Sequence, residues 1–254
     1  MKLLAPAFFI FLAIVGLAIL ILGCEGQKDS AVSPQTGTGG SMARFAITGN
    51  TLYIVSKESL EVYNIADAGN PVKAVTKDMS VGIETIFPYQ NRLFIGASDG
   101  MYIYNNSTPD NPTFLTKYTH VQSCDPVVVQ GDYAYVTLRS GVACRNFVTL
   151  STLDVVDVSN PSNPQLVNSQ QMLSPYGLGV SGNRLFVCEG DRGLKVFDVS
   201  DPKLPVQKHF FEDLPSYDVI VRNNRLIVTG AKGLFQYAYD DADNVELLSK
   251  IPVL

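Results

Sequence analysis

The sequence predicts an all-β fold, a β-propeller of five four-stranded blades, from three observations. First, an Asn/Asp turn followed by an apolar strand recurs five times, with the turn residue at Asn50, Asn91, Asp132, Asn183 and Asn224. The spacings are 41, 41, 51 and 41 residues, so one unit carries an insertion of 10. Second, a parallel ladder of apolar segments begins at Leu60, Met101, Leu153, Leu194 and Leu234. A fixed period of this length is typical of repeat architectures such as propellers and solenoids.

The third observation is a strand that is apolar on both faces. In "GNRLFVC", Leu185 and Val187 point to one side, and Phe186 and Cys188 point to the other. A strand buried on both sides needs a layer above and a layer below, which sheets stacked in a closed ring supply. A solenoid remains the alternative, although no polar capping repeat is visible.

The fourth unit shows the expected strands of one blade, "YGLGV", "RLFVCE", "LKVFDV" and "PVQKHFF". An Asn/Gly turn joins the first two strands, and the Gly-containing hairpin "EGDRG" joins the second and third. The turn to the fourth strand is rich in Asp, Ser, Asn and Pro. We expect the propeller domain to span residues 42–254.

The N-terminal segment predicts export and anchoring. An uncharged apolar run at 3–23 follows Lys2, and "ILGC" at its end resembles the lipobox of bacterial lipoproteins. The resemblance implies a signal peptide at 1–23, cleavage before Cys24 and lipidation of Cys24. An uncleaved signal-anchor helix is the alternative, because the run is long enough to span a bilayer. Both interpretations place the rest of the chain outside the cytoplasm.

The segment that follows, 24–41, reads as the lipidated Cys and a flexible Gly/Ser/Thr/Pro-rich linker. Glu25 stands where the inner-membrane retention signal of enterobacterial lipoproteins has Asp. The outer membrane, on its periplasmic or cell-surface face, is therefore the expected location.

The second ladder, sharpest in "LDVVDVSNPSNP" and "LKVFDVSDPKLP", resembles the LVIVD repeat of bacterial extracellular and lipoprotein β-propellers. The resemblance covers residues 46–254 and is loosest in the second and fifth units. It implies the fold and an envelope location, and says little about activity.

Composition narrows the function further. The net charge of −5 and the absence of basic runs argue against nucleic-acid binding. Only His120 and His209 are present, far apart, so no metal or cofactor is expected. The acidic segment "DDADN" at 240–244 lacks the Gly and terminal Glu of an EF-hand loop, so a solvated turn is expected there.

Asp157 and Asp198 are the acids within the apolar ladder. The aligned positions in the other units are Asn64, Asn105 and Ala238. Since an amide cannot act as a general base, this column predicts a hydrogen-bonded turn in place of a catalytic site.

Three cysteines remain after Cys24 is assigned to lipid, in an oxidising compartment. We expect a Cys124–Cys144 disulfide, because the connector into the third unit and the inserted hairpin emerge on the same face. Cys188 should be a buried free thiol. A Cys/His pair of Cys124 with His120 is the competing interpretation.

The mouth of the central channel is the expected ligand site. Seven residues before each turn position stand Ala43, Glu84, Asp125, Tyr176 and Tyr217, and Arg139, Arg192 and Lys232 lie on hairpins of the same face. Of these we expect Glu84, Asp125, Tyr176, Tyr217, Arg139 and Arg192 to bind a ligand.

Aromatic, acidic and basic residues at a concave site suit a glycan or peptide, or an envelope protein partner. The leading hypothesis is a lipid-anchored binding module without catalysis. A glycan-acting hydrolase using Glu84 and Asp125 is the alternative, and a scaffold subunit of an outer-membrane complex is the third hypothesis.

Overall fold

The computed structural model describes residues 40–79, 82–119, 126–140 and 150–253, which are built from β-strands. The first ten strands are β1 (Phe45–Thr48), β2 (Thr51–Val55), β3 (Ser59–Asn64), β4 (Val72–Asp78), β5 (Ile83–Tyr89), β6 (Arg92–Ala97), β7 (Gly100–Asn105), β8 (Thr113–Tyr118), β9 (Val127–Gln130) and β10 (Tyr133–Leu138). The others are β11 (Ser151–Asp157), β12 (Gln165–Met172), β13 (Leu178–Ser181), β14 (Arg184–Cys188), β15 (Leu194–Asp198), β16 (Val206–Phe211), β17 (Asp218–Arg222), β18 (Arg225–Gly230), β19 (Gly233–Tyr239) and β20 (Val245–Pro252).

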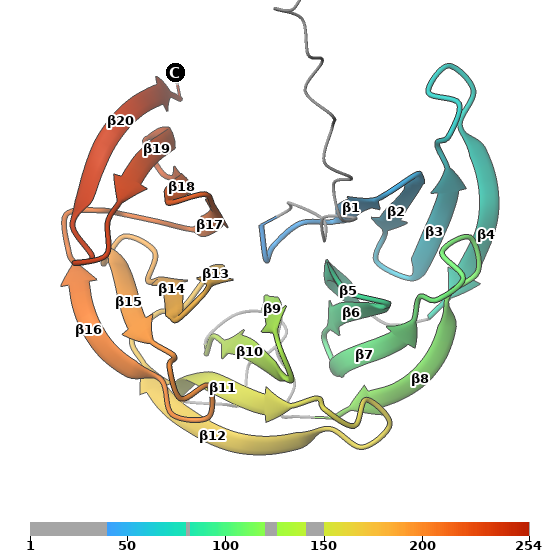
Figure 1. Cartoon of the computed structure of the whole chain (residues 1–254), viewed down its shortest axis with the longest axis horizontal. Coiled ribbons are helices and arrows are strands. Elements are labelled where there is room, and N and C mark those ends of the chain that lie inside the picture. Colours follow the sequence, from blue (N-terminus) through green and yellow to red (C-terminus); the bar gives the residue numbers. More distant parts are fainter. Residues whose placement is uncertain (1–39, 80–81, 120–125, 141–149, 254) are drawn as a thin grey trace, which may run out of the picture. The chain divides into compact units, whose positions relative to one another are not determined.

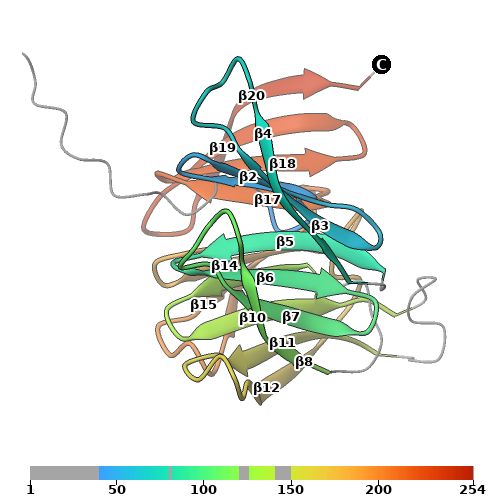
Figure 2. The same cartoon turned by 90° about the vertical axis from the view of Figure 1, so that its right-hand side faces the viewer.

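The strands form five four-stranded antiparallel sheets, which we call blades 1 to 5: β1–β4, β5–β8, β9–β12, β13–β16 and β17–β20. The first strand of each blade lies nearest the centre and the fourth lies at the outside (Figure 1). Hairpins project from both ends of the strands (Figure 2). The predicted all-β propeller of five four-stranded blades is confirmed. Within the described residues, no helix is long and apolar enough to cross a membrane.

The turns repeat as closely as the strands. The first residue of each inner hairpin has a positive φ, which glycine supplies at Gly49, Gly131 and Gly182 and which Gln90 and Asn223 adopt elsewhere. These turns fix the register between the first two strands of each blade.

The turn into the outer strand is held by a side chain, as the Asn/Asp column predicted. Asp198 Oδ1 accepts a hydrogen bond from the Ser200 amide at 2.8 Å, and Asp157 accepts one from Ser159 at 2.9 Å. Hydrogen bonds from the serine that follows hold the pKa of both carboxyls below the ordinary value. Asn64 makes the same contact with the amide two residues on. The column is therefore a turn-forming feature, with Asp and Asn interchangeable.

The fifth blade departs from this column. Ala238 occupies the aligned register, paired with Arg225, and Asp240 takes over the turn by accepting hydrogen bonds from Ala242 and Asn244. The expected solvated turn at 240–244 is thus confirmed, and no group of metal-ligating side chains is found in the described part of the chain.

The core is divided into four apolar clusters, one between each pair of successive blades. The cluster between blades 4 and 5, for example, contains Phe186, Cys188 and Val196 from one side, and Leu226 and Val228 from the other. Cys188 is buried and free, as expected, and burial raises the pKa of its thiol. Both faces of the middle strands of blades 2 to 4 are therefore covered, as the sequence predicted.

The expectation of a closed ring was wrong at one place. Neighbouring blades contact through β1–β5, β5–β9, β9–β13 and β13–β17, and no comparable contact or fifth core cluster joins blade 5 to blade 1 among the described residues. The open side is visible between β17–β20 and β1–β4 (Figure 1). Apolar side chains that face it are exposed, including Phe45 at 61% and Leu234 at 38%.

At its inner end, this open side is bridged by the segment that precedes β1. Asp218 of β17 accepts a hydrogen bond from the Ser41 hydroxyl at 3.1 Å, and the same hydroxyl accepts one from the Leu178 amide at 2.7 Å. The Ala43 carbonyl accepts a hydrogen bond from the Ile86 amide of blade 2. Residues 40–43 therefore tie blades 2, 4 and 5 together near the centre, and we call them the inner strap.

Candidate ligand-binding site

The candidate site is built where the inner strands begin. The residues at this level in the five units are Arg44, Thr85, Pro126, Gly177 and Asp218, each one position after the predicted ring of Ala43, Glu84, Asp125, Tyr176 and Tyr217. The inner strands surround the centre, so segments that are far apart in the sequence lie near one another there (Figure 1).

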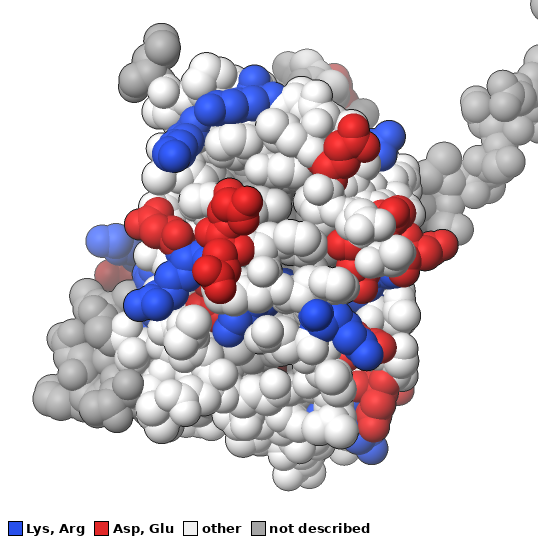
Figure 3. Space-filling view, turned by 90° about the vertical axis from the view of Figure 1, so that its left-hand side faces the viewer, with Lys and Arg blue, Asp and Glu red and all other residues white. Residues whose placement is uncertain are grey.

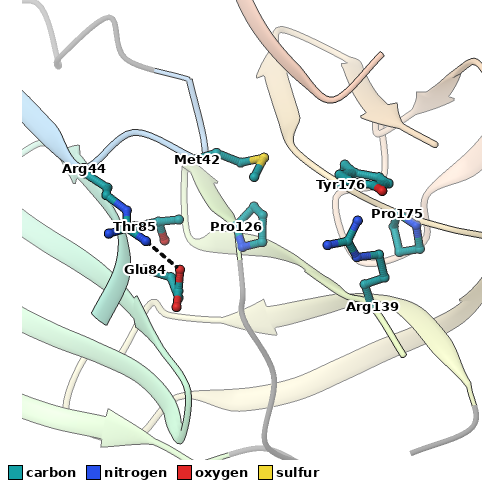
Figure 4. A pocket seen from close by; sticks show the side chains of 8 residues that line it. All are labelled: Met42, Arg44, Glu84, Thr85, Pro126, Arg139, Pro175 and Tyr176. Atoms are coloured by element: carbon teal, nitrogen blue, oxygen red, sulfur yellow. Dashed lines mark hydrogen bonds and ion pairs between the residues drawn. The ribbon is translucent and has the colours of Figure 1, made fainter. Parts of the chain in front are cut away.

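A cavity of about 220 Å³ lies at this level. It is lined by Met42, Arg44, Glu84, Thr85, Pro126, Arg139, Pro175 and Tyr176 (Figure 4). Apolar side chains and a few polar groups surround a concave space, which is the usual character of a small-ligand site.

One wall of this pocket is formed by Arg139, which stacks on the ring of Tyr176. The guanidinium carbon of Arg139 lies 3.7 Å from the centre of the Tyr176 ring. Tyr176 in turn contacts Tyr217, with ring centres 5.1 Å apart and planes inclined by 36°. The Tyr217 hydroxyl donates a hydrogen bond to Asp191 at 2.9 Å, and this bond raises the pKa of Tyr217. Residues from blades 4 and 5 thus hold Arg139 of blade 3 in place.

The opposite wall carries an ion pair. Arg44 Nη2 lies 3.0 Å from Glu84 Oε2 and joins the entry of blade 1 to β5 of blade 2. Figure 4 shows this pair across the pocket from Arg139, with Met42 and Pro126 between them. Glu84 is the one carboxylate among the described residues of the lining.

A buried carboxyl, Asp218 of β17, lies close to this level and contacts the inner strap. Asp218 accepts hydrogen bonds from Ser41 and from the backbone amides of Val219 and Met42. Burial nevertheless raises its pKa to about 6. A Cβ at Gly177 would come within 2.1 Å of the Asp218 carboxylate, so this close approach requires glycine.

Three of the six predicted binding residues, Glu84, Arg139 and Tyr176, line one pocket. Tyr217 supports Tyr176 from outside it, and Arg192 lies in the exposed hairpin after β14, away from the lining. Asp125 and the predicted disulfide cysteines, Cys124 and Cys144, lie outside the described residues, as does Cys24.

The prediction missed Met42, Arg44, Thr85, Pro126 and Pro175. Each lies one position from a predicted ring residue. Adding the residues directly before and after each predicted ring residue would have included them.

The fold and this pocket define a class of protein, a β-propeller with a small, mainly apolar cavity that contains a few charged groups where the inner strands begin. Within this fold, the LVIVD repeat model matches residues 123–142, 147–171 and 176–212. These segments include the third and fourth units, where the ladder is sharpest. No curated protein sequence matches the chain.

Solved structures resemble the fold at low sequence identity. A protein from Lactobacillus plantarum has a TM-score of 0.65 and 15% identity, over 82% of this chain and 74% of that one. A functionally unknown protein from Desulfotomaculum acetoxidans has a TM-score of 0.66 and 11% identity, over 83% and 69%. The periplasmic gluconolactonase of Pseudomonas aeruginosa has a TM-score of 0.57 and 15% identity, over 81% and 68%. At such identities the likeness supports the fold alone.

Proposed function

We propose that this protein is a binding module of the cell envelope, anchored by lipid at Cys24, that takes up a small polar ligand without chemical turnover. The observation that carries the proposal is the pocket around Arg139 and Tyr176. It combines a preorganised cation, an aromatic ring and apolar walls in a cavity of about 220 Å³. This volume is below the roughly 300–1,000 Å³ of drug-sized sites, so a ligand of one sugar or amino-acid unit suits it.

Binding is favoured over catalysis by the state of the polar groups. A glycosidase needs two carboxylates facing one bond, with one of them protonated to act as the acid. Glu84 is paired with Arg44 at 3.0 Å, so its carboxylate is already engaged by a counter-charge within the lining. The strongly raised carboxyl pKa belongs to Asp218, which is engaged by the inner strap outside the pocket lining.

Binding is tested by ligand titration of the domain, residues 40–254, against a library of sugars and amino acids. We expect a ligand whose affinity falls at least about tenfold in Tyr176→Ala, since the ring positions Arg139. Arg192→Gln is the matched control, because Arg192 lies on the same face but away from the lining. If the protein turns over any library member and Glu84→Gln abolishes that turnover, the protein is a hydrolase and the binding module is rejected.

Anchoring is tested in cells by metabolic labelling with a fatty acid. Incorporation should disappear in Cys24→Ala and persist in Cys188→Ala, because Cys188 is buried. Label retained in Cys24→Ala would reject lipidation at Cys24, and a wild-type protein without label would favour the uncleaved anchor. Fractionation of the membranes then tests the proposed outer-membrane location.

A further inference from the structure

We propose that the ligand of this pocket carries a carboxylate, and that Arg139 binds it. This inference rests on the proposed binding function and goes further by naming the chemical class of the ligand: a small carboxylic acid, such as a sugar acid or an amino acid.

The first argument is the state of the Arg139 donors. A guanidinium has five N–H donors in its plane, and stacking on an aromatic ring uses only its face. Arg139 stacks on Tyr176 at 3.7 Å, and no described residue accepts a hydrogen bond from it or forms an ion pair with it. Within the described part of the chain its in-plane donors are therefore unengaged, and they have the fork geometry that matches a carboxylate.

The second argument is the charge balance of the lining. Arg44 and Glu84 cancel each other through their 3.0 Å ion pair. Arg139 then leaves the described lining with a charge of +1, in a chain whose net charge is −5. A local positive charge in an acidic protein selects an anion at this place.

The third argument is preorganisation. Tyr176 is itself held by Tyr217, and its carbonyl accepts a hydrogen bond from Thr137 at 2.6 Å. Arginine side chains lose rotamer entropy when a ligand fixes them, and a cation already fixed by its support avoids much of that cost. Because Arg139 covers a face of Tyr176, that face is closed to stacking by a neutral sugar, which favours charge recognition.

The experiment uses matched pairs of probes in which the carboxylate of one member is replaced by a neutral group in the other. One pair is D-galacturonic acid and D-galactose, and the other is N-acetyl-alanine and its amide. Binding to the domain is measured by NMR titration at pH 7. We expect the acid of at least one pair to bind about tenfold or more tighter than its neutral partner, the usual range for a charged hydrogen bond. The pair that shows this preference tells whether the ligand is a sugar acid or an amino acid.

The variants separate the two proposals. Arg139→Gln should abolish the preference for the acid, Arg139→Lys should keep part of it, and Arg192→Gln should leave it unchanged. If neutral probes bind as well as acids, or if Arg139→Gln preserves the preference, the carboxylate inference is overturned while the binding site stands. If neither acids nor neutral probes bind, the proposed site is overturned, and the inference with it.

Discussion

Blades 4 and 5 are copies of one repeat, but the face that each turns away from the preceding blade has different surroundings. The face of blade 4 toward blade 5 is closed: Phe186, Cys188, Leu194 and Val196 are all at most 1% exposed. The equivalent positions in blade 5 are Ile227, Thr229, Leu234 and Gln236, which face the open side and are all partly or largely exposed. A repeat position is therefore buried only where a neighbouring blade is present.

The open side differs in composition as well as in exposure. Blade 5 has Thr229 and Gln236 where blade 4 has Cys188 and Val196, so this face is more polar. Blade 1 keeps Phe45 and Ile54, at 61% and 36% exposure, on the face that turns away from blade 2. Charged side chains of both signs are interspersed on the side formed by blades 4 and 5, which leaves broad uncharged areas (Figure 3).

The largest expected effect on stability comes from truncating Phe186 in blade 4, and the equivalent residue in blade 5, Ile227, serves as the comparison. Phe186 is fully buried and packs edge-on against Tyr239, with ring centres 5.1 Å apart. Phe186→Ala should cost about 3–5 kcal/mol of unfolding free energy, because it removes a large buried ring and leaves a cavity. Ile227→Ala at the open side should cost about 1 kcal/mol or less. Urea unfolding of both variants measures the difference.

Chemical labelling gives an independent reading of this comparison. In a background with Cys24, Cys124 and Cys144 replaced by serine, the native Cys188 should resist a maleimide because it is 0% exposed. Thr229→Cys places a thiol at the equivalent position of blade 5, where it should react in the folded protein. Equal protection of both thiols, or equal losses in Phe186→Ala and Ile227→Ala, would show that blade 5 is covered in solution.

The second-largest loss of stability is expected from breaking an ion pair that blade 4 has and blade 5 lacks. Glu189 and Lys195 form a buried ion pair at 2.8 Å, and Glu189 also accepts the Ser174 amide. Glu189→Gln leaves the buried ammonium without its counter-charge, and should cost about 3 kcal/mol. Blade 5 has Gly230 and Phe235 at these positions, so it has no such pair.

The control for this pair is Lys208→Met, which removes an exposed partner of Asp198 in the same blade. It should leave the urea midpoint unchanged. The double change Glu189→Leu with Lys195→Met should recover much of the stability, because both charges are removed together. A double variant as unstable as Glu189→Gln would mean that the hydrogen bonds of Glu189 to the backbone matter more than the ion pair.

These comparisons show what sequence could and could not predict. The strands, turns and buried middle faces follow from local patterns, since an apolar alternation and a turn residue act within one blade. Closure of the ring is not local: it depends on whether the face with Leu234 meets the face with Phe45. The prediction of closure came from the two-sided apolar strand of the fourth unit, which has a neighbour on both sides in the arc as well as in a closed ring.

The candidate site was likewise predictable in its local part, and its contacts between blades were not. The column that contains Glu84 and Tyr176 follows from the repeat, because equivalent residues enter the centre at one level. The partners of these residues do not follow from the repeat. Arg44 pairs with Glu84 and Arg139 rests on Tyr176 across blade boundaries, and such contacts depend on the twist of the inner strands and on the angle between blades.

The inner strap should make stability depend on pH. The folded pKa of Asp218 is about 6, above the unfolded value near 3.8, so the folded state binds the proton more tightly. This contribution is fully present below about pH 3.8 and is lost as pH rises through about 6. Wild type should lose about 3 kcal/mol relative to Asp218→Asn across this range.

The pH effect is measured by urea unfolding of wild type and Asp218→Asn between pH 4 and 7. Ser41→Ala tests the contact of the strap directly, because the Ser41 hydroxyl donates a hydrogen bond to the Asp218 carboxylate and lowers its pKa. Its removal should shift the window to higher pH. Parallel pH profiles of wild type and Asp218→Asn would show that the strap does not hold a buried carboxyl at the inner end of the open side.

The smallest expected effect concerns the ion pair across a closed blade boundary. Arg44 and Glu84 join blades 1 and 2 at the mouth of the channel, but their side chains are 52% and 34% exposed. Solvent screens such a pair, so Glu84→Gln should cost at most about 1 kcal/mol and less at high salt. Urea unfolding at low and high salt measures this dependence. Blades 1 and 2 are held instead by their apolar cluster, which includes Tyr53, Leu60 and Ile95. A loss in Glu84→Gln as large as that in Phe186→Ala would mean that polar contacts at the mouth, more than apolar packing between blades, hold the arc together.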